Sequence, residues 1–255
     1  MSNRMLLINS TIAFALAALV MFTLHELGHA AAAISFGYHP IVRPFSVDYG
    51  PATKTQNIVI LLTGPFVSLV LGMIFLAMPR AGKGFWRLLC LWLGLNGVQT
   101  FTGYLITAPF GGIGDIGGTL HLLNAPLWVA LVVFAVGWIG TFLLGRLATI
   151  RLLGFTDPSS DIPSQLRSVG LFAWLAGVLV VLIFSIGSFD ASITGIFEVF
   201  GIITSGIYLS LVRYFLPRVK VSGEPLELHF PVLGSVLLVA IALIRLLIFA
   251  PGLHL

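Results

Sequence analysis

The chain has 255 residues, of which 58% are hydrophobic and 9% are charged, whereas a soluble domain carries about 25% charged residues. This composition cannot cover a soluble domain with polar surface, so it predicts an integral membrane protein. The formal net charge is +4, but the basic residues are scattered between apolar segments, which excludes a nucleic-acid-binding surface. The single cysteine, Cys90, excludes an intrachain disulfide.

Long apolar segments recur along the whole chain. A membrane-spanning helix needs about 20 mostly apolar residues. On that basis we predict an all-α polytopic membrane protein with six to seven transmembrane helices. The predicted spans are Met5–Ser35, Asn57–Met78, Trp86–Thr107, Leu127–Ile150, Ser168–Phe189, Ile193–Leu216 and Val232–Phe249.

The segment GYHPIVRPFSVDYGPATKT, residues 37–55, differs from these spans. It mixes β-branched and aromatic residues with Pro, Gly and Asp, and it is too short and too polar to cross a membrane. We expect a short extended hairpin or re-entrant strand there. Irregular backbone at membrane depth must be buried in protein or line a wet cavity, so this segment is expected to cover such a cavity.

Lysine and arginine residues are unequally divided between the two sides of the predicted spans. Cytoplasmic loops of membrane proteins carry an excess of Lys and Arg. We therefore expect a multi-pass protein of the plasma or inner membrane, with a cytoplasmic N-terminus and the end of the first span toward the outer half of the bilayer. One side holds Arg4, Arg80, Lys83, Arg87, Arg146, Arg151, Arg167, Arg213, Arg218 and Lys220, and the other holds Arg43 and Lys54.

The end of the first span carries the sequence H-E-L-G-H at residues 25–29. Ionisable residues inside a span are costly and by default indicate a functional site. On a helix, His25 and His29 share one face about 6 Å apart along the axis, so both can bind one Zn²⁺, as in the H-E-x-x-H pattern of metalloproteases. Glu26 can then take a proton from a zinc-activated water. The alternative is that neighbouring helices satisfy both histidines and that Glu26 pairs with one of them.

A catalytic zinc site usually has three protein ligands and a water. We predict Asp115 as the third ligand, because its loop is rich in glycine, which permits close approach, and lacks a basic partner. Asp115 could instead only cap a short helix. Asp48 is the rival ligand, although Arg43 and Lys54 could pair with it. The other candidates are His39, Cys90, His121, Asp190, Glu198 and His254.

Small residues line one face of the second span, where Gly64, Ser68 and Gly72 recur every four residues. They form a flat face for close helix packing. Pro65 removes a backbone donor and loosens the turn around Leu61. We expect this face to pack against the first span, and the alternative is that the opened backbone and Ser68 help to bind an extended peptide.

Four other polar residues are candidates for roles near the site. Asn96 and His121 could make polar contacts to a substrate. Glu198 and Arg245 lie inside the predicted sixth and seventh spans, where they could pair with each other or gate access.

The H-E-L-G-H motif, the G-P-x-x-S motif at Gly64–Ser68 and the glycine-rich loop around Asp115 occur in this order over roughly the first 150 residues. In these features the chain resembles the site-2 protease family of intramembrane zinc metalloproteases. The resemblance implies zinc held by His25, His29 and Asp115, with Glu26 as general base. It also implies cleavage of membrane-embedded peptide segments.

The chain departs from the family pattern at three points. The family often has asparagine where Ser68 stands. Its usual Asn-x-x-Pro…Asp-Gly pattern is only loosely matched by YLITAPFGGIGDIGG. Well-studied members place zinc nearer the cytosolic face, whereas the distribution of Lys and Arg here predicts the outer half of the bilayer.

We therefore expect a zinc metalloprotease core over residues 1–150, a polar loop over 151–167 and accessory transmembrane helices over 168–255. The expected function is that of a membrane-embedded zinc metalloendopeptidase with one Zn²⁺ per chain and a membrane protein or peptide as substrate. The alternatives are a non-catalytic membrane binding or regulatory protein that retains the fold, a zinc hydrolase of non-peptide substrates, and a transporter that uses Glu198 and Arg245.

Overall fold

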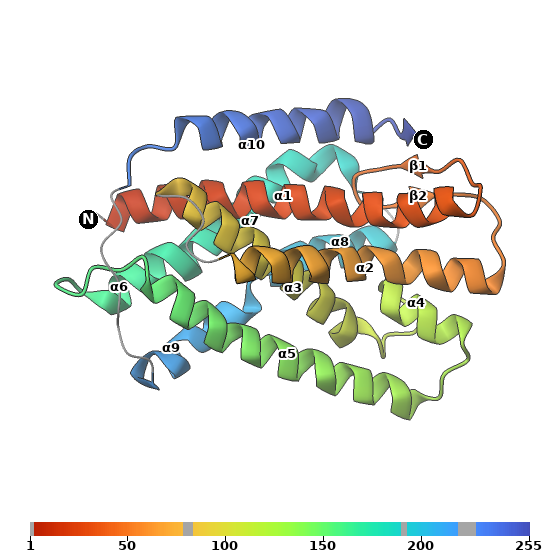
Figure 1. Ribbon diagram of the computed structural model, residues 1–255, viewed down its shortest axis with the longest axis horizontal. Helices are drawn as coiled ribbons and strands as arrows, with labels where there is room; N and C mark the ends of the chain where they lie inside the picture. The colour runs from red at the N-terminus through yellow and green to blue at the C-terminus, as the bar shows by residue number, and fades with distance from the viewer. Residues whose placement is uncertain (1–2, 79–83, 190–192, 219–227) are drawn as a thin grey trace.

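The computed structural model describes residues 3–78, 84–189, 193–218 and 228–255, which are drawn as ribbon in Figure 1. Within these residues, six helices are long and apolar enough to cross a membrane, which confirms the predicted all-α polytopic fold. Arg80, Lys83, Asp190 and Lys220, named above, lie outside the described ranges. The six helices are Asn3–Ser35, Lys54–Ala77, Leu127–Leu153, Ile162–Ser188, Gly195–Phe215 and Val232–Phe249.

The first half of the chain contains four long helices and one short one. Each long helix begins and ends within three residues of a predicted span. One of the four long helices, α3, is not among the six helices that are apolar enough to cross a membrane. Its residues Asn96, Gln99, Thr100 and Thr102 make it more polar. The elements are α1 (Asn3–Ser35), α2 (Lys54–Ala77), α3 (Phe85–Thr107), α4 (Gly114–Leu122) and α5 (Leu127–Leu153).

The helices of the second half are interrupted by π-helical and 3-10 turns. The predicted fifth span begins earlier than expected, at Ile162, because Asp161 caps the helix by accepting from the backbone N–H of Ser164. The elements are α6 (Ile162–Leu166), η1 (Arg167–Phe172), α7 (Ala173–Ser185), η2 (Ile186–Ser188), α8 (Ile193–Thr204), η3 (Ile207–Leu211), α9 (Val212–Phe215), η4 (Leu216–Arg218), α10 (Val232–Ile244) and η5 (Arg245–Phe249).

Helix α1 forms the centre of the molecule. It lies between α10 on one side and α2 and α3 on the other (Figure 1), and it also contacts α7. Its alanine run, residues 13, 15, 17 and 18, is buried, and small side chains let neighbouring helices approach closely. Phe14 packs edge to face on Trp92 of α3, with ring centroids 5.1 Å apart. The helix that carries H-E-L-G-H is therefore enclosed by protein.

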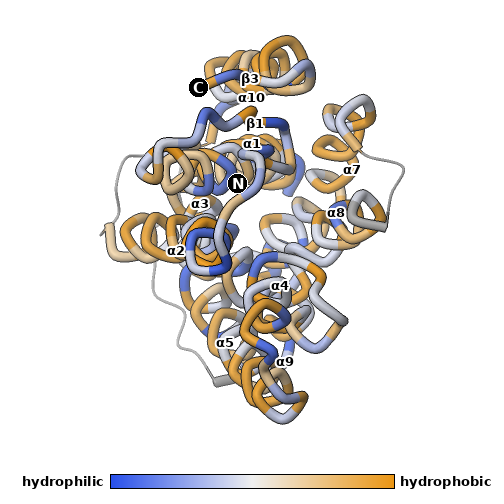
Figure 2. The backbone as a smooth tube through the Cα atoms, turned by 90° about the vertical axis from the view of Figure 1, so that its right-hand side faces the viewer, coloured by the Kyte–Doolittle hydropathy of each residue, from blue (hydrophilic) through white to orange (hydrophobic). Residues whose placement is uncertain are grey.

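The outward faces of the surrounding helices are apolar. Figure 2 shows hydrophobic residues along α2, α5, α7 and α10. A surface of this kind is expected to contact lipid, since apolar side chains cost nothing in a hydrocarbon environment. Exposed examples are Phe66, Val70, Met73, Leu127, Leu131, Ile139, Leu143, Leu179, Ile183, Val232, Val236 and Leu247.

The segment after α1 forms the predicted hairpin. Strands β1 (Ile41–Val42) and β2 (Val47–Asp48) are antiparallel, with Ile41 opposite Asp48. A third strand, β3 (Leu253–His254), pairs with the other side of β1, so the sheet order is β2-β1-β3. The sequence did not predict β3, because two residues carry no periodicity. The hairpin is thus held by a segment more than 200 positions later in the chain.

The two ends of the molecule differ in charge. The start of α1 and the end of α5 lie at one end in Figure 1, and the hairpin and the start of α5 lie at the other. Arg87 at the start of α3 stacks on Phe155, 4.9 Å from the ring centroid, next to the end of α5. Arg43 and Lys54 belong to the hairpin end. The unequal division of basic residues thus corresponds to the two ends of the fold, and which end faces the cytoplasm stays a prediction.

Candidate metal centre

The last turns of α1 bring His25, Glu26 and His29 into the protein interior. All three are buried, with 2%, 7% and 5% of their surface exposed. The Nε2 atoms of His25 and His29 lie 3.0 Å apart. The two rings therefore project from one face of the helix toward a common point, as the i, i+4 spacing predicts.

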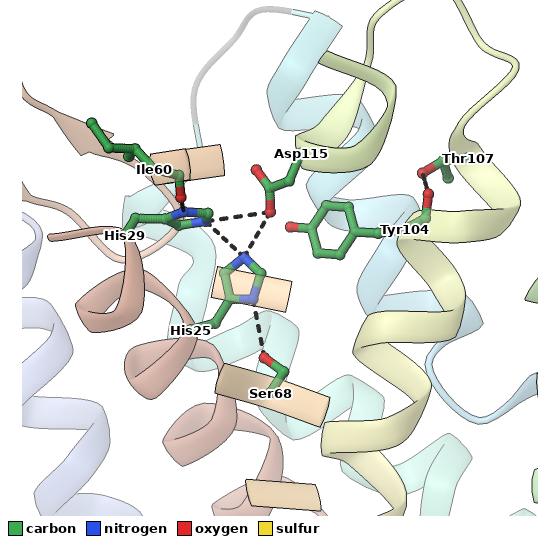
Figure 3. A network of polar contacts seen from close by, with 7 residues as sticks. All are labelled: His25, His29, Ile60, Ser68, Tyr104, Thr107 and Asp115. Carbon is green, nitrogen blue, oxygen red and sulfur yellow. Dashed lines mark hydrogen bonds and ion pairs between the residues drawn. The ribbon is translucent and has the colours of Figure 1, made fainter. Parts of the chain in front are cut away.

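Asp115 reaches the same point from the first turn of α4. Its Oδ2 lies 3.0 Å from Nε2 of His25 and 3.3 Å from Nε2 of His29 (Figure 3). The N-cap of α4 is Ile113, with no side-chain cap hydrogen bond, so Asp115 does not serve merely as a cap. Burial would raise the pKa of Asp115, but the imidazoles of His29 and His25 outweigh it and lower this pKa, which favours the carboxylate.

The loop before Asp115 depends on glycine. Gly111, Gly112 and Gly114 adopt positive φ angles of 66°, 85° and 68°, where residues with a side chain are strained. A Cβ atom on Gly114 would also lie 3.0 Å from the ring of Tyr104. These glycines allow α4 to begin directly beside α3. From that position Asp115, in the first turn of α4, reaches the histidines.

The rival ligand Asp48 lies elsewhere. Its Oδ2 accepts from Nε of Arg43 at 3.1 Å, and 61% of its side chain is exposed. His39 and His121 are also exposed. Throughout the described ranges, His25, His29 and Asp115 form the one group of three His, Cys, Asp or Glu residues whose ligand atoms all lie within 4.8 Å of one another.

Helix α2 holds both imidazoles through their Nδ1 atoms. Nδ1 of His29 donates to the carbonyl of Ile60 at 2.6 Å, and Nδ1 of His25 lies 3.1 Å from Oγ of Ser68 (Figure 3). A carbonyl can only accept, so Nε2 of a neutral His29 keeps its lone pair. Such outer contacts fix the tautomer and ring orientation of metal-binding histidines.

The G-P-x-x-S motif of α2 explains this arrangement. A Cβ atom on Gly64 would overlap the imidazole of His29, so only glycine leaves room for the ring. Pro65 has no backbone N–H, so the carbonyl of Leu61 loses its helical donor, and the carbonyl of the adjacent Ile60 accepts from His29. Ser68 is fully buried against His25. The predicted packing against α1 is thus confirmed for Gly64 and Ser68. It is wrong for Gly72, where an added Cβ would lie 2.7 Å from the backbone nitrogen of Val98 of α3. The contacts that hold both histidines were not indicated by the sequence.

Tyr104 of α3 is a site residue that the sequence did not reveal. Its ring stacks on the imidazole of His25, with centroids 5.2 Å apart and an interplanar angle of 8°. Figure 3 shows its hydroxyl directed toward Asp115. Its only sequence signal is its place near the end of α3, because neither its spacing nor its type belongs to a metal-binding pattern.

The predicted substrate contacts Asn96 and His121 do not join this cluster. Asn96 is buried on α3, and its side-chain nitrogen has no hydrogen-bond partner within the described part of the chain. It lies eight residues, or about 12 Å, along the helix from Tyr104. His121 is exposed near the end of α4. Their contact with a substrate stays a prediction.

The three converging atoms suit a zinc ion. Ligands 2.0–2.1 Å from a tetrahedral Zn²⁺ lie about 3.3 Å from one another, and the three ligand atoms here are 3.0 to 3.3 Å apart. Two imidazole nitrogens and a carboxylate oxygen at such distances repel one another unless a cation or a shared proton lies among them. The residues present therefore fit a zinc site with three protein ligands.

The C-terminal half also reaches the site, through Arg245 of η5. This residue is 2% exposed, and it donates to Oγ1 of Thr23 at 2.9 Å and to the carbonyl of Pro44 at 3.0 Å. Its guanidinium lies 4.8 Å from the ring centroid of Phe45. These contacts join η5 to α1 and to the hairpin. Arg245 also interacts electrostatically with Glu26, so spans outside the first 150 residues contribute to the field at the site.

Comparison of the chain with models of protein families, with curated proteins and with solved structures found no match.

Proposed function

We propose that the protein is a membrane-embedded zinc metalloendopeptidase that resembles the site-2 protease family. The observation that carries this proposal is the convergence of His25, His29 and Asp115 on one point inside a membrane-spanning bundle. Glu26, which follows His25 in α1, supplies the general base that such a site needs. Costly polar groups gathered at one place within spans favour a functional role over a structural one.

Each residue has a defined task in peptide hydrolysis. When bound, Zn²⁺ polarises the scissile carbonyl and lowers the pKa of a water toward 7. His25, His29 and Asp115 would hold the ion. The Glu26 carboxylate takes a proton from the attacking water while the water oxygen bonds to the carbonyl carbon. The carbon–nitrogen bond then breaks, and Glu26 passes the proton to the leaving nitrogen, so the base is regenerated.

An extended substrate has a suitable surface beside this centre. β2 is an outer strand in the order β2-β1-β3, and an outer strand can bind a peptide through main-chain hydrogen bonds. Tyr49, directly after β2, donates to Asn57 at the start of α2 and interacts electrostatically with Asp115. We infer that a membrane protein or peptide, unwound into an extended strand, adds to β2 and presents its scissile bond to the metal centre.

The proposal includes a sidedness. The hairpin end holds Arg43 and Lys54. Arg4, Arg151 and Arg167 belong to the start of α1, the end of α5 and the start of η1, at the opposite end of the fold. By the excess of positive charge in cytoplasmic loops, the metal centre lies in the outer half of a plasma or inner membrane, with the N-terminus in the cytoplasm.

Zinc content separates this proposal from a structural role for the histidines. The purified full-length protein in detergent should contain close to one zinc per chain, and His25→Ala should contain almost none. Absence of zinc from the wild type would contradict both the zinc peptidase and the alternative of a zinc hydrolase of non-peptide substrates. Removal of zinc by a chelator should stop cleavage of membrane-embedded test peptides in proteoliposomes, and added zinc should restore it. Hydrolysis of a non-peptide substrate alone would leave the metal centre standing and overturn the peptidase assignment.

A further inference from the structure

Tyr104 is placed to act on the reacting carbonyl and not only to support the site. It lies on α3, on the side of His25 away from the body of α1, and its phenol ring runs parallel to the imidazole. Its hydroxyl is directed toward the point where Nε2 of His25, Nε2 of His29 and Oδ2 of Asp115 converge (Figure 3). A fourth polar atom is thus aimed at the same place from a third helix.

The position of Tyr104 is tightly determined. One face of its ring stacks on His25, and the start of α4 packs against the ring so closely that only glycine fits at position 114. A phenylalanine would make both contacts equally well. The hydroxyl is therefore the feature that packing does not explain. A polar tip on a half-buried aromatic residue normally finds a hydrogen-bond partner.

Asp115 is one partner of this hydroxyl, because the two side chains share a hydrogen bond at the point where the ligand atoms converge. The Oδ2 atom of Asp115 is already shared between His25 and His29, at 3.0 and 3.3 Å. The two remaining polar groups near this point differ in burial: the side chain of Tyr104 is partly buried, and that of Glu26 is buried. Glu26 approaches the site from α1 and Tyr104 from α3, so a base and a hydrogen-bond donor come from two different helices.

We propose that Tyr104 is a catalytic residue, whose hydroxyl donates a hydrogen bond to the oxyanion that develops on the scissile carbonyl. The inference rests on the proposed peptidase function. Glu26 removes the proton of the attacking water as the carbon–oxygen bond forms, and the carbonyl π electrons move onto the oxygen. The hydroxyl of Tyr104 stabilises that charge without transferring its proton. Donors aimed at developing charge are among the largest contributions to catalysis.

Tyr104→Phe tests this role, because it keeps the ring and removes the hydroxyl. We expect zinc content and KM to stay within about twofold of wild type and kcat to fall about 10²–10³-fold, as for loss of one oxyanion-hole donor. A readout independent of turnover is the affinity for a phosphinic peptide, which mimics the tetrahedral state, measured by calorimetry on the zinc-loaded protein. Its Kd should rise by a similar factor. The ordinary substrate peptide, which stays uncleaved in the Glu26→Gln background, should bind with the same Kd whether or not Tyr104→Phe is added.

Tyr208→Phe is the matched control. Tyr208 is fully buried in η3, which packs on α5, and its hydroxyl has no hydrogen-bond partner among the residues described. This variant should match the wild type in zinc content, kcat and phosphinate affinity.

The possible outcomes are distinguishable. If Tyr104→Phe weakens zinc binding but keeps the wild-type kcat at saturating zinc, Tyr104 supports Asp115 and the catalytic role is wrong. If Tyr104→Phe equals the wild type throughout, the inference also fails, while the peptidase assignment stands. If the wild type itself neither binds zinc nor cleaves peptides, the proposed function fails first.

Discussion

Gly64 of α2 faces the imidazole of His29 with no space for a side chain between them. The close crossing of α1 and α2 at this point is continued by Gly28, where an added Cβ would lie 3.0 Å from Val67. The position of the His29 imidazole is therefore set by the absence of a side chain on the neighbouring helix. This relationship makes a small substitution informative.

Gly64→Ala should displace His29 and weaken the metal centre. The added methyl group must push the imidazole aside or separate α1 from α2, and overpacking of this kind costs about 1–3 kcal/mol. We expect zinc affinity to fall at least 10-fold and the thermal midpoint in detergent to drop. Gly201→Ala is the control, because a Cβ on Gly201 of α8 meets nothing within 4 Å. Equal zinc affinity in both variants would contradict the proposed crossing.

Glu26→Gln should separate metal binding from catalysis. Glutamine keeps the shape and hydrogen-bonding capacity of the side chain but cannot take a proton, and loss of a general base costs about 10²–10⁴ in rate. We expect close to one zinc per chain and almost no peptide cleavage. The measurements are metal analysis and cleavage of a membrane-embedded peptide in proteoliposomes. Wild-type turnover in this variant would remove Glu26 from the mechanism and leave the metal site intact.

Asp115→Ala and Asp48→Ala form a matched pair for the third ligand. Loss of even an outer partner of a metal ligand lowers affinity about 10–100-fold, so loss of Asp115 should lower zinc affinity by at least that factor. Asp48→Ala removes only an exposed pair with Arg43, so it should bind zinc like the wild type. Equilibrium dialysis of both variants gives the ranking, and the reverse order would transfer the ligand role to Asp48.

Single cysteines in a Cys90→Ser background should report the sidedness of the fold. Thr53 before α2 and Ser159 in the loop between α5 and α6 are both exposed, and the start of α2 and the α5–α6 loop lie at opposite ends of the molecule. We expect Thr53→Cys to react with a membrane-impermeant maleimide from outside the cell, and Ser159→Cys to react only after permeabilisation. Labelling of Thr53→Cys from the cytoplasm would invert the proposed orientation.

The spans and the convergence of His25 and His29 could be predicted because their signals are local. Twenty apolar residues specify a span wherever they occur, and the i, i+4 spacing alone places His25 and His29 on one face. Asp115 required elimination among distant residues, since nothing in its own segment states which helix it will meet. Its glycine-rich loop without a basic partner is the signal that favours it over Asp48, and the structure brings it to the histidines.

Tyr104, Arg245 and β3 could not be predicted, because their roles depend on tertiary contacts. The stacking of Tyr104 on His25 requires knowledge of how α3 crosses α1. Arg245 donates to Thr23 and Pro44, residues more than 200 positions away. The two residues of β3 have no pattern of their own and are recognised as a strand only through their pairing with β1.

The pairing of β3 with β1 has a consequence for biosynthesis. Ile41 emerges from the ribosome early, but its partner His254 follows only after the last membrane-spanning helix has been made. Closing such a long loop comes late in assembly, since non-local contacts form only after the intervening chain is in place. During synthesis the hairpin therefore lacks one of its two flanking strands. The three-stranded sheet beside the candidate metal centre is therefore complete only once the whole bundle has been inserted.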